Sequence, residues 1–126
     1  MDWFRALVGP SVRLAEAGPA VAAAMRRLLL ASSGAPTHLV VQVGRERQIN
    51  FAAARSPGSA RVYVRARNPE EAASLALLGF GHDNGSVYSR KTDEVGVDDL
   101  PGEVARVTLA IARTVWHETD GVAVIL

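Results

Sequence analysis

The stretch Gly81-His82-Asp83-Asn84-Gly85 holds the residue types that come closest to a catalytic site. A histidine beside an aspartate can bind a metal ion or act as a general base. One such pair supplies too few ligands for a metal, and the other histidines have unlike surroundings, since His38 begins a predicted strand and His117 ends a predicted helix. A tight turn explains the same stretch. We therefore predict a hairpin turn, and a small metal-dependent hydrolase that uses His82 and Asp83 is the third functional hypothesis.

Other catalytic and cofactor-binding patterns are missing from the sequence. It contains neither a phosphate-binding loop, nor Gly-x-Gly-x-x-Gly after a predicted strand, nor a Gly-x-Ser-x-Gly nucleophile elbow. Glu70 and Glu71 resemble a pair of catalytic carboxylates, but neighbouring residues of a helix point about 100° apart. A place in the first turn of a helix explains both acids. The chain is therefore predicted not to be an enzyme, with no catalytic residue, no metal site and no cofactor.

Arginines that surround Tyr63 provide the clearest binding chemistry. The alternation of Arg61-Val-Tyr-Val-Arg-Ala-Arg67 turns the tyrosine and its arginines to one side of a strand, and Arg47 is expected nearby. Trp116, late in the last predicted helix, is either a core residue or a partner contact. The candidate partner-binding residues are Arg47, Arg61, Tyr63, Arg65, Arg67 and Trp116.

Three interpretations of this arginine-rich face stay open. It is a solvated surface, or it binds an acidic or amphipathic segment of another protein, or it binds single-stranded nucleic acid through stacking and phosphate contacts. A single tyrosine is a thin platform for stacking, and the acidic second half of the chain would repel phosphates. The sequence therefore favours a protein segment as the partner, with nucleic acid as the alternative.

The composition bounds the class of protein. At 126 residues and 48% hydrophobic content, the chain is long enough for a single domain over residues 1–126 and too short for two of ordinary size. It has no cysteine, which fits a reducing compartment. No run approaches the roughly 18 apolar residues of a membrane span, and the start, with Asp2, makes a poor signal peptide. These features predict a cytoplasmic protein without a membrane span.

The net charge of +1 hides a difference between the two halves. Residues 1–67 have a net charge of +7, and residues 68–126 have a net charge of −6. Either the halves fold together and neutralise each other, or one face of the protein is basic and the other acidic, so that each selects a partner of opposite sign. Lys91 is the sole lysine, and this preference for arginine is typical of a GC-rich bacterial genome.

Hydrophobic periodicity and turn signals predict an α+β domain, with an antiparallel sheet flanked by helices in the order α-β-β-β-α-β-β-α. Residues 1–18 are predicted as an N-terminal helical extension that includes a helical segment at Ser11–Ala17. Asn68 is a strong helix cap, and Asn84-Gly85 is the best hairpin turn. The predicted elements are a helix from Pro19 to Ala31, strands at Thr37–Val43, Glu46–Ala53 and Arg61–Arg67, a helix from Pro69 to Leu78, a hairpin of Phe80–Asp83 and Ser86–Arg90, a helix from Leu100 to about Trp116, and a possible extra C-terminal strand at Val122–Leu126.

The whole order of elements, from about Pro19 to His117, resembles the type III secretion chaperone-like fold, and especially the small chaperone-like domains of actinobacteria. In those domains a second strand containing Phe-Ala precedes a leucine-rich helix that ends in Leu-Gly-aromatic. Ile49-Asn-Phe51-Ala-Ala53 and Leu77-Leu78-Gly79-Phe80 match that pattern here, and a strand Val87-Tyr88-Ser89 and a helix end at Val115-Trp116 follow.

The resemblance implies a non-enzymatic chaperone or adaptor domain, often dimeric, whose sheet and helices cradle an extended segment of a client protein. Well-known members are acidic, whereas the sheet-forming half of this chain is strongly basic, which would suit an acidic client. A homodimer is also expected from the Ala- and Leu-rich helix Pro69–Leu78 and from a possible edge strand at the C-terminus.

Overall fold

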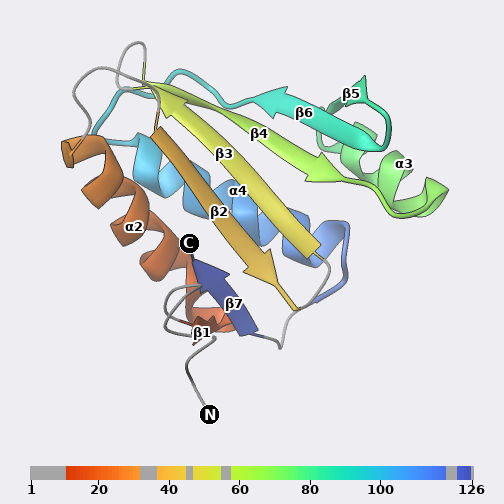
Figure 1. Cartoon of the computed structure of the whole chain (residues 1–126), viewed down its shortest axis with the longest axis horizontal. Helices are drawn as coiled ribbons and strands as arrows, with labels where there is room; N and C mark the ends of the chain where they lie inside the picture. Colours follow the sequence, from red (N-terminus) through yellow and green to blue (C-terminus); the bar gives the residue numbers. More distant parts are fainter. Residues whose placement is uncertain (1–10, 32–36, 45–46, 55–57, 119–121, 126) are drawn as a thin grey trace.

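The computed structural model describes residues 11–31, 37–44, 47–54, 58–118 and 122–125. In this part of the chain, helices pack against one antiparallel sheet with the strand order β1-β7-β2-β3-β4-β6-β5 (Figure 1). The strands are β1 (Ser11–Arg13), β2 (Thr37–Val43), β3 (Arg47–Ala54), β4 (Ser59–Arg65), β5 (Gly81–Asn84), β6 (Val87–Lys91) and β7 (Val122–Ile125). The helices are a short 3-10 turn η1 (Leu14–Glu16), α2 (Ala17–Ala31), α3 (Pro69–Leu77) and α4 (Leu100–Thr114).

The predicted fold class is confirmed. Helix α2 precedes the strands β2, β3 and β4, helix α3 precedes the hairpin of β5 and β6, and helix α4 follows. The chain therefore has an α+β fold with the order α-β-β-β-α-β-β-α, to which β1 and β7 add strands at one side of the sheet. No helix of the described residues is long and apolar enough to cross a membrane.

The N-terminal segment differs from the prediction. Ser11–Arg13 is a strand, so the helical segment predicted at Ser11–Ala17 is wrong for its first residues. This strand pairs with β7 near the other end of the chain, with Ser11 opposite Val124. Helix α2 starts at Ala17 and continues through Pro19. Backbone N–H groups in the first turn of a helix have no acceptor within the helix, so a proline there costs no hydrogen bond. Residues 1–10 of the predicted extension lie outside the described residues.

The possible C-terminal strand is present as β7, but it does not lie at the edge of the sheet. Val124 pairs with Ser11 of β1 on one side and with Gln42 of β2 on the other. The edge strands of the described sheet are β1 and β5. The expectation of an exposed C-terminal edge strand, one of two reasons for predicting a homodimer, is therefore wrong.

The central strands follow the predicted alternation. Strand β2 has the predicted bounds, and β3 begins and ends one residue later than predicted. Gly44 between them has a φ of 69°, a left-handed conformation that favours glycine in a tight connection. Strand β4 begins and ends two residues before its predicted bounds, so that Arg67 lies beyond it.

The core lies between the sheet and the helices α2 and α4. Along α2 the buried residues recur at the spacing of one helix face, and along α4 a second set of buried residues does the same. Gly18 brings these two helices close together, because a Cβ at this position would lie 3.3 Å from Leu109 Cδ1. The buried positions that fix the two helices are Ala17, Val21, Met25 and Leu29 of α2 and Val104, Val107, Ile111 and Val115 at or just after α4.

Helix α3 begins as its sequence predicts. Asn68 Oδ1 accepts a hydrogen bond of 2.9 Å from the backbone N–H of Glu71, and Pro69 occupies the first turn. Gly79, with a φ of 89°, follows the helix in the left-handed conformation that commonly ends one. The helix therefore has a fixed start directly after β4, which matters for the arginine that joins the two elements.

Candidate partner-binding surface

Helices α2 and α4 pack on the same face of the sheet, and no described element covers the other face, which we call the open face (Figure 1). Side chains alternate between the two faces along each strand, so the residues between the core positions form this surface. The open face consists of His38, Val40 and Gln42 from β2, Gln48, Asn50 and Ala52 from β3, Arg61, Tyr63 and Arg65 from β4, and Val87, Ser89 and Lys91 from β6.

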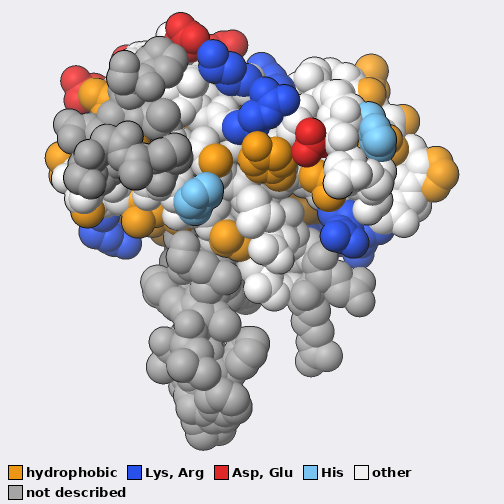
Figure 2. Space-filling view, turned by 45° about the horizontal axis from the view of Figure 1, so that its top comes forward, with side chains coloured by type: hydrophobic (Ala, Val, Ile, Leu, Met, Phe, Trp, Pro, Cys, Tyr) orange, Lys and Arg blue, Asp and Glu red, His pale blue; other side chains and the backbone are white. Residues whose placement is uncertain are grey.

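Within these four strands, the charged side chains of the open face are all basic, namely Arg61, Arg65 and Lys91. Lys91 Nζ donates to Glu94 Oε1 at 2.8 Å, and Arg61 Nη2 donates to the hydroxyl of Ser89 at 3.1 Å. Neither Arg61 nor Arg65 pairs with a carboxylate of the described chain. The space-filling view in Figure 2 shows Lys and Arg side chains gathered in groups, with Asp and Glu side chains beside some of them.

The register places two of these cations side by side. Arg61 of β4 lies directly opposite Lys91 of β6, and like charges in directly opposed positions destabilise an antiparallel pair. Glu94 pairs with Lys91 and offsets part of this repulsion. Arg61 is left as the cation of the pair without a carboxylate partner in the described chain.

Arg47 lies on the other side of the sheet from this basic group. It is on the same face of β3 as Ile49 and Phe51, which are buried under the helices, so its side chain leaves the sheet on the opposite face from Arg61. Its guanidinium lies 5.9 Å from the ring centre of Trp116, and Nη1 donates to Glu118 Oε2 at 3.3 Å. A cation over an indole face and a partly exposed ion pair each contribute about 0.5–1 kcal/mol at most, so these contacts orient Arg47 more than they stabilise the fold.

Arg67 turns away from the strand toward Glu71. Its Nη2 donates to Glu71 Oε2 at 2.8 Å, and its backbone N–H donates to Glu71 Oε1 at 2.9 Å. Glu71 is only 5% exposed. Burial by itself raises the pKa of this carboxyl, but the hydrogen bonds from the Arg67 side chain and backbone, with the charges of Arg67 and Arg47, outweigh it and hold the pKa below its ordinary value.

A hollow at the end of the sheet, where β3 begins and β4 ends, brings five of the six predicted residues together. Its volume is about 240 Å³. Arg61 is the predicted residue that does not line it, because it lies farther along β4. The hollow is lined by Arg47, Gln48, Asn50, Tyr63, Val64, Arg65, Arg67, Val87 and Trp116.

Trp116 is both a core residue and a wall of this hollow. It is 5% exposed, and its indole N–H has no hydrogen-bond acceptor among the described residues. Buried donors are almost always paired, which makes this N–H an exception. The two sequence-based interpretations of Trp116, core residue and partner contact, are therefore compatible in position.

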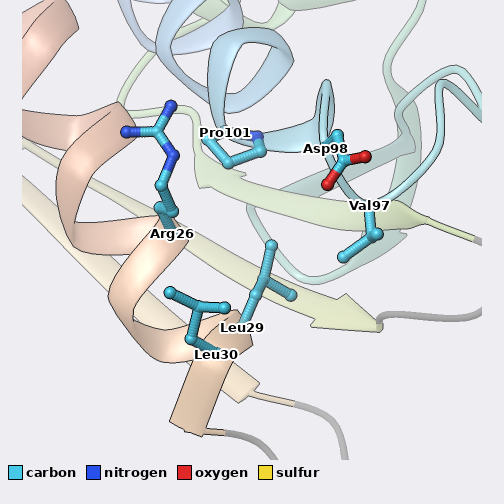
Figure 3. A pocket seen from close by; sticks show the side chains of 6 residues that line it. All are labelled: Arg26, Leu29, Leu30, Val97, Asp98 and Pro101. Atoms are coloured by element: carbon cyan, nitrogen blue, oxygen red, sulfur yellow. The ribbon is translucent and has the colours of Figure 1, made fainter.

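A second, smaller hollow of about 170 Å³ lies on the helical side of the molecule. Figure 3 shows Arg26, Leu29 and Leu30 of α2 on one side and Val97, Asp98 and Pro101 on the other. Leu30 is 74% exposed here. This hollow presents an apolar edge to solvent, separate from the open face.

The hairpin predicted around Asn84-Gly85 is present, and His82 lies in its first strand. Gly85, with a φ of 56°, lies between β5 and β6. His82 Nε2 lies 2.7 Å from the carbonyl oxygen of Gly85, to which its N–H donates, and its ring meets that of Tyr88 edge-on. No group of three or more potential metal ligands occurs in the part of the chain that the structure describes. The hydrogen bond from His82 to Gly85 thus helps to close the turn.

Two residues that position the site were not singled out for it from the sequence. Glu71 was assigned to the first turn of α3, which is correct, but it also binds Arg67. Glu118 follows the last helix, where His117 has a φ of 52° and Glu118 N donates to Ala112 O at 2.8 Å, which turns the chain back toward Arg47. The spacing from Arg67 to Glu71 was a detectable signal, whereas the Arg47–Glu118 pair joins distant parts of the chain.

Comparisons with known proteins add no relative to this picture. No protein-family model matches the chain, and no curated protein or solved structure shows significant similarity to it. The resemblance to the type III secretion chaperone-like fold therefore remains a prediction based on the order of elements and the short motifs quoted above.

Proposed function

We propose that this chain is a non-enzymatic protein-binding module of chaperone or adaptor type, which holds an extended acidic segment of a client protein on the open face. The observation that supports this most is the charge of that face. Arg61 and Arg65 are basic residues without a carboxylate partner in the described chain, and between them lies Tyr63. An extended segment with acidic side chains at alternate positions matches the period of these side chains along the strand.

The composition of the open face favours a polypeptide over a nucleic acid. Tyr63 is the only Phe, Tyr or Trp of the open face defined above, and His38 is its one other ring on which a base could stack. Single-stranded nucleic acids are held by successive stacking of bases on several aromatic rings. Small and amide side chains, such as Asn50, Ala52 and Gln48, surround the tyrosine and suit the side chains and backbone of a peptide.

Binding of defined peptides tests the proposal. The probes would be fluorescein-labelled extended peptides in which glutamate alternates with valine. Matched peptides with glutamine or lysine in place of glutamate are the controls. Fluorescence anisotropy should show binding of the glutamate peptide, weaker binding as salt screens the charges, and no binding of the lysine peptide. A single-stranded oligonucleotide serves as the competitor that represents the alternative.

Arg61→Glu is the variant that locates the peptide. Loss of a charge-assisted contact worth about 1.5–3 kcal/mol should weaken binding of the glutamate peptide about 10- to 100-fold. Arg113→Glu makes the same charge change at an exposed position of α4 and should leave the affinity within about twofold, since long-range charges are screened. Equal losses in both variants, or tighter binding of the oligonucleotide than of the peptide, would contradict the proposal.

A further inference from the structure

We propose that the hollow at the end of the sheet is a receptor for one carboxylate group of the bound segment. This inference rests on the proposed function, because Gln48, Asn50, Tyr63 and Arg65 belong both to the open face and to the wall of the hollow. The hollow thus continues the surface on which the segment lies. It would recognise a single acidic side chain or the terminal carboxylate of a chain, which present the same oxyanion.

Trp116 gives the first reason for an oxyanion. Its indole can donate a hydrogen bond and cannot accept one, and this donor is buried without an acceptor among the described residues. Leaving such a group unpaired destabilises the protein. Trp116 also lines the hollow, so a carboxylate oxygen that reached the indole N–H from there would give this donor an acceptor.

Arg65 gives the second reason. It lines the hollow and makes no ion pair within the described part of the chain. Two other arginines on the wall are held in place by carboxylates, Arg47 by Glu118 and Arg67 by Glu71. The guanidinium of Arg65 is therefore the one that we assign to the incoming carboxylate, which it can bind through two parallel N–H groups.

The size of the hollow limits the ligand. Sites for small molecules and cofactors measure about 300–1,000 Å³, whereas this one measures about 240 Å³. The hollow is therefore smaller than the usual site of a nucleotide or another large ligand. One side chain or one chain terminus of a peptide fits, and its remaining residues would extend over the open face.

The fluorescence of Trp116 provides the test. The chain has two tryptophans, and in a Trp3→Phe protein the emission reports Trp116 alone. The probes are three short acetylated peptides of otherwise equal sequence: one with a central glutamate and an amidated end, one with a central glutamine and a free carboxylate end, and one with glutamine and an amidated end. Inorganic phosphate at equal ionic strength is the fourth probe.

The proposal expects a saturable change in Trp116 emission with a peptide that carries a carboxylate, and none with the neutral peptide. Comparison of the glutamate peptide with the free-end peptide decides between a side chain and a terminus as the source of the carboxylate. In Arg65→Gln the dissociation constant should rise at least about tenfold, as expected for loss of a charge-assisted hydrogen bond. Arg113→Gln, the matched control on α4, should leave it unchanged.

Three results would overturn the inference: equal responses to the neutral and carboxylate peptides, tighter binding of phosphate than of either carboxylate, or an Arg65→Gln protein with unchanged affinity. The proposed function is judged separately, because Arg61 does not line the hollow. If Arg61→Glu weakens the long glutamate peptide while Trp116 is silent, the hollow is no receptor but the open face still binds. If the short carboxylates bind and the long peptide does not, the hollow remains and the proposed function fails.

Discussion

At the scale of single residues, the arginines of this chain fall into two groups that differ in their partners. Arg47 and Arg67 pair with Glu118 and Glu71, so acids of the second half of the chain neutralise arginines of the first half. Arg61 and Arg65 have no such partner in the described chain. Folding therefore neutralises part of the charge asymmetry at the end of the sheet, and a basic group remains on the open face.

Glu71 carries a prediction about stability and pH. Its pKa is lowered in the folded protein, so the unfolded chain takes up the proton at a higher pH than the folded one. The stability from the Arg67–Glu71 contact is thus complete above about pH 4.3, the ordinary pKa of a glutamate, and is lost as the pH falls through the lowered value. Glu71→Gln should reduce the free energy of unfolding at pH 7 by about 1–3 kcal/mol and flatten its dependence on acid pH.

Urea denaturation at a series of pH values from neutral to acid measures this effect. Glu70→Gln is the matched control. Glu70 is the neighbouring acid in the first turn of α3, and its side chain is exposed. A Glu70→Gln protein that loses as much stability as Glu71→Gln, or a Glu71→Gln protein with the original pH dependence, would show that the Arg67 contact is not what holds this carboxylate.

At the scale of elements, local signals predicted what local interactions build. The cap at Asn68 and the hairpin turn that contains Gly85 depend on residues within a few positions of one another, and the structure has both. The strand β1 could not be predicted, because its hydrogen-bond partners lie in β7 at the other end of the chain and a three-residue strand has no periodicity of its own.

The candidate site could be predicted in composition but not in shape. The alternation of side chains along β3 puts Arg47 on the same face as Ile49. That pattern alone was sufficient to place Arg47 on the opposite face from Arg61. What the sequence could not show is that β4 ends before Arg67, and that Trp116 reaches the same hollow from the residues that follow α4. Both depend on tertiary packing.

Substitution of Gly58 tests the contact between the loops around Gly58 and Gly96, with Gly102 as the comparison. Gly58 has a φ of 82°, and a Cβ there would lie 2.7 Å from backbone atoms of Gly96, so Gly58→Ala should destabilise the protein by about 1–3 kcal/mol. Gly102 lies within α4 with open space around its Cα. Gly102→Ala should stabilise it by about 0.5–1 kcal/mol because alanine favours the helix.

Thermal unfolding of the two variants beside the original protein measures the difference. The account of this loop contact fails if Gly58→Ala unfolds at the original temperature. It also fails if both substitutions shift the unfolding temperature in the same direction, because they would then share a cause unrelated to the local space at each glycine.

At the scale of the whole molecule, one face of the sheet packs against the helices, and the other, the open face, carries the residues that we propose for binding. Helices α2 and α4 lie on one face of the sheet (Figure 1). Arg61, Arg65 and Lys91 are on the other face. An antiparallel sheet can leave one face uncovered in this way, with polar residues on it. The fold thus positions Arg61, Tyr63 and Arg65 on a rigid surface, which suits a binding module of the kind that we propose.

Self-association is a prediction at the same scale. With the C-terminal strand inside the sheet, the proposal of a homodimer now rests on α3, whose Leu77 is 86% exposed. We expect light scattering at high concentration to give the mass of two chains, and Leu77→Glu to give the mass of one, because a buried interface does not accept an unpaired charge. A single-chain mass for the original protein at high concentration would contradict the dimer and leave the open face unaffected.

The central claim is that an acidic segment lies on the open face, and backbone amide chemical shifts measure this directly. Titration of the isotope-labelled protein with the glutamate–valine peptide should move the amide signals of β3, β4 and β6 most, with those of Asn50, Tyr63 and Ser89 among the largest, and should leave the exposed side of α2 and α4 unchanged. If instead the largest shifts fall on α2 and α4, or the spectrum does not change at a saturating concentration of peptide, the open face is not the binding surface and the proposed function is wrong.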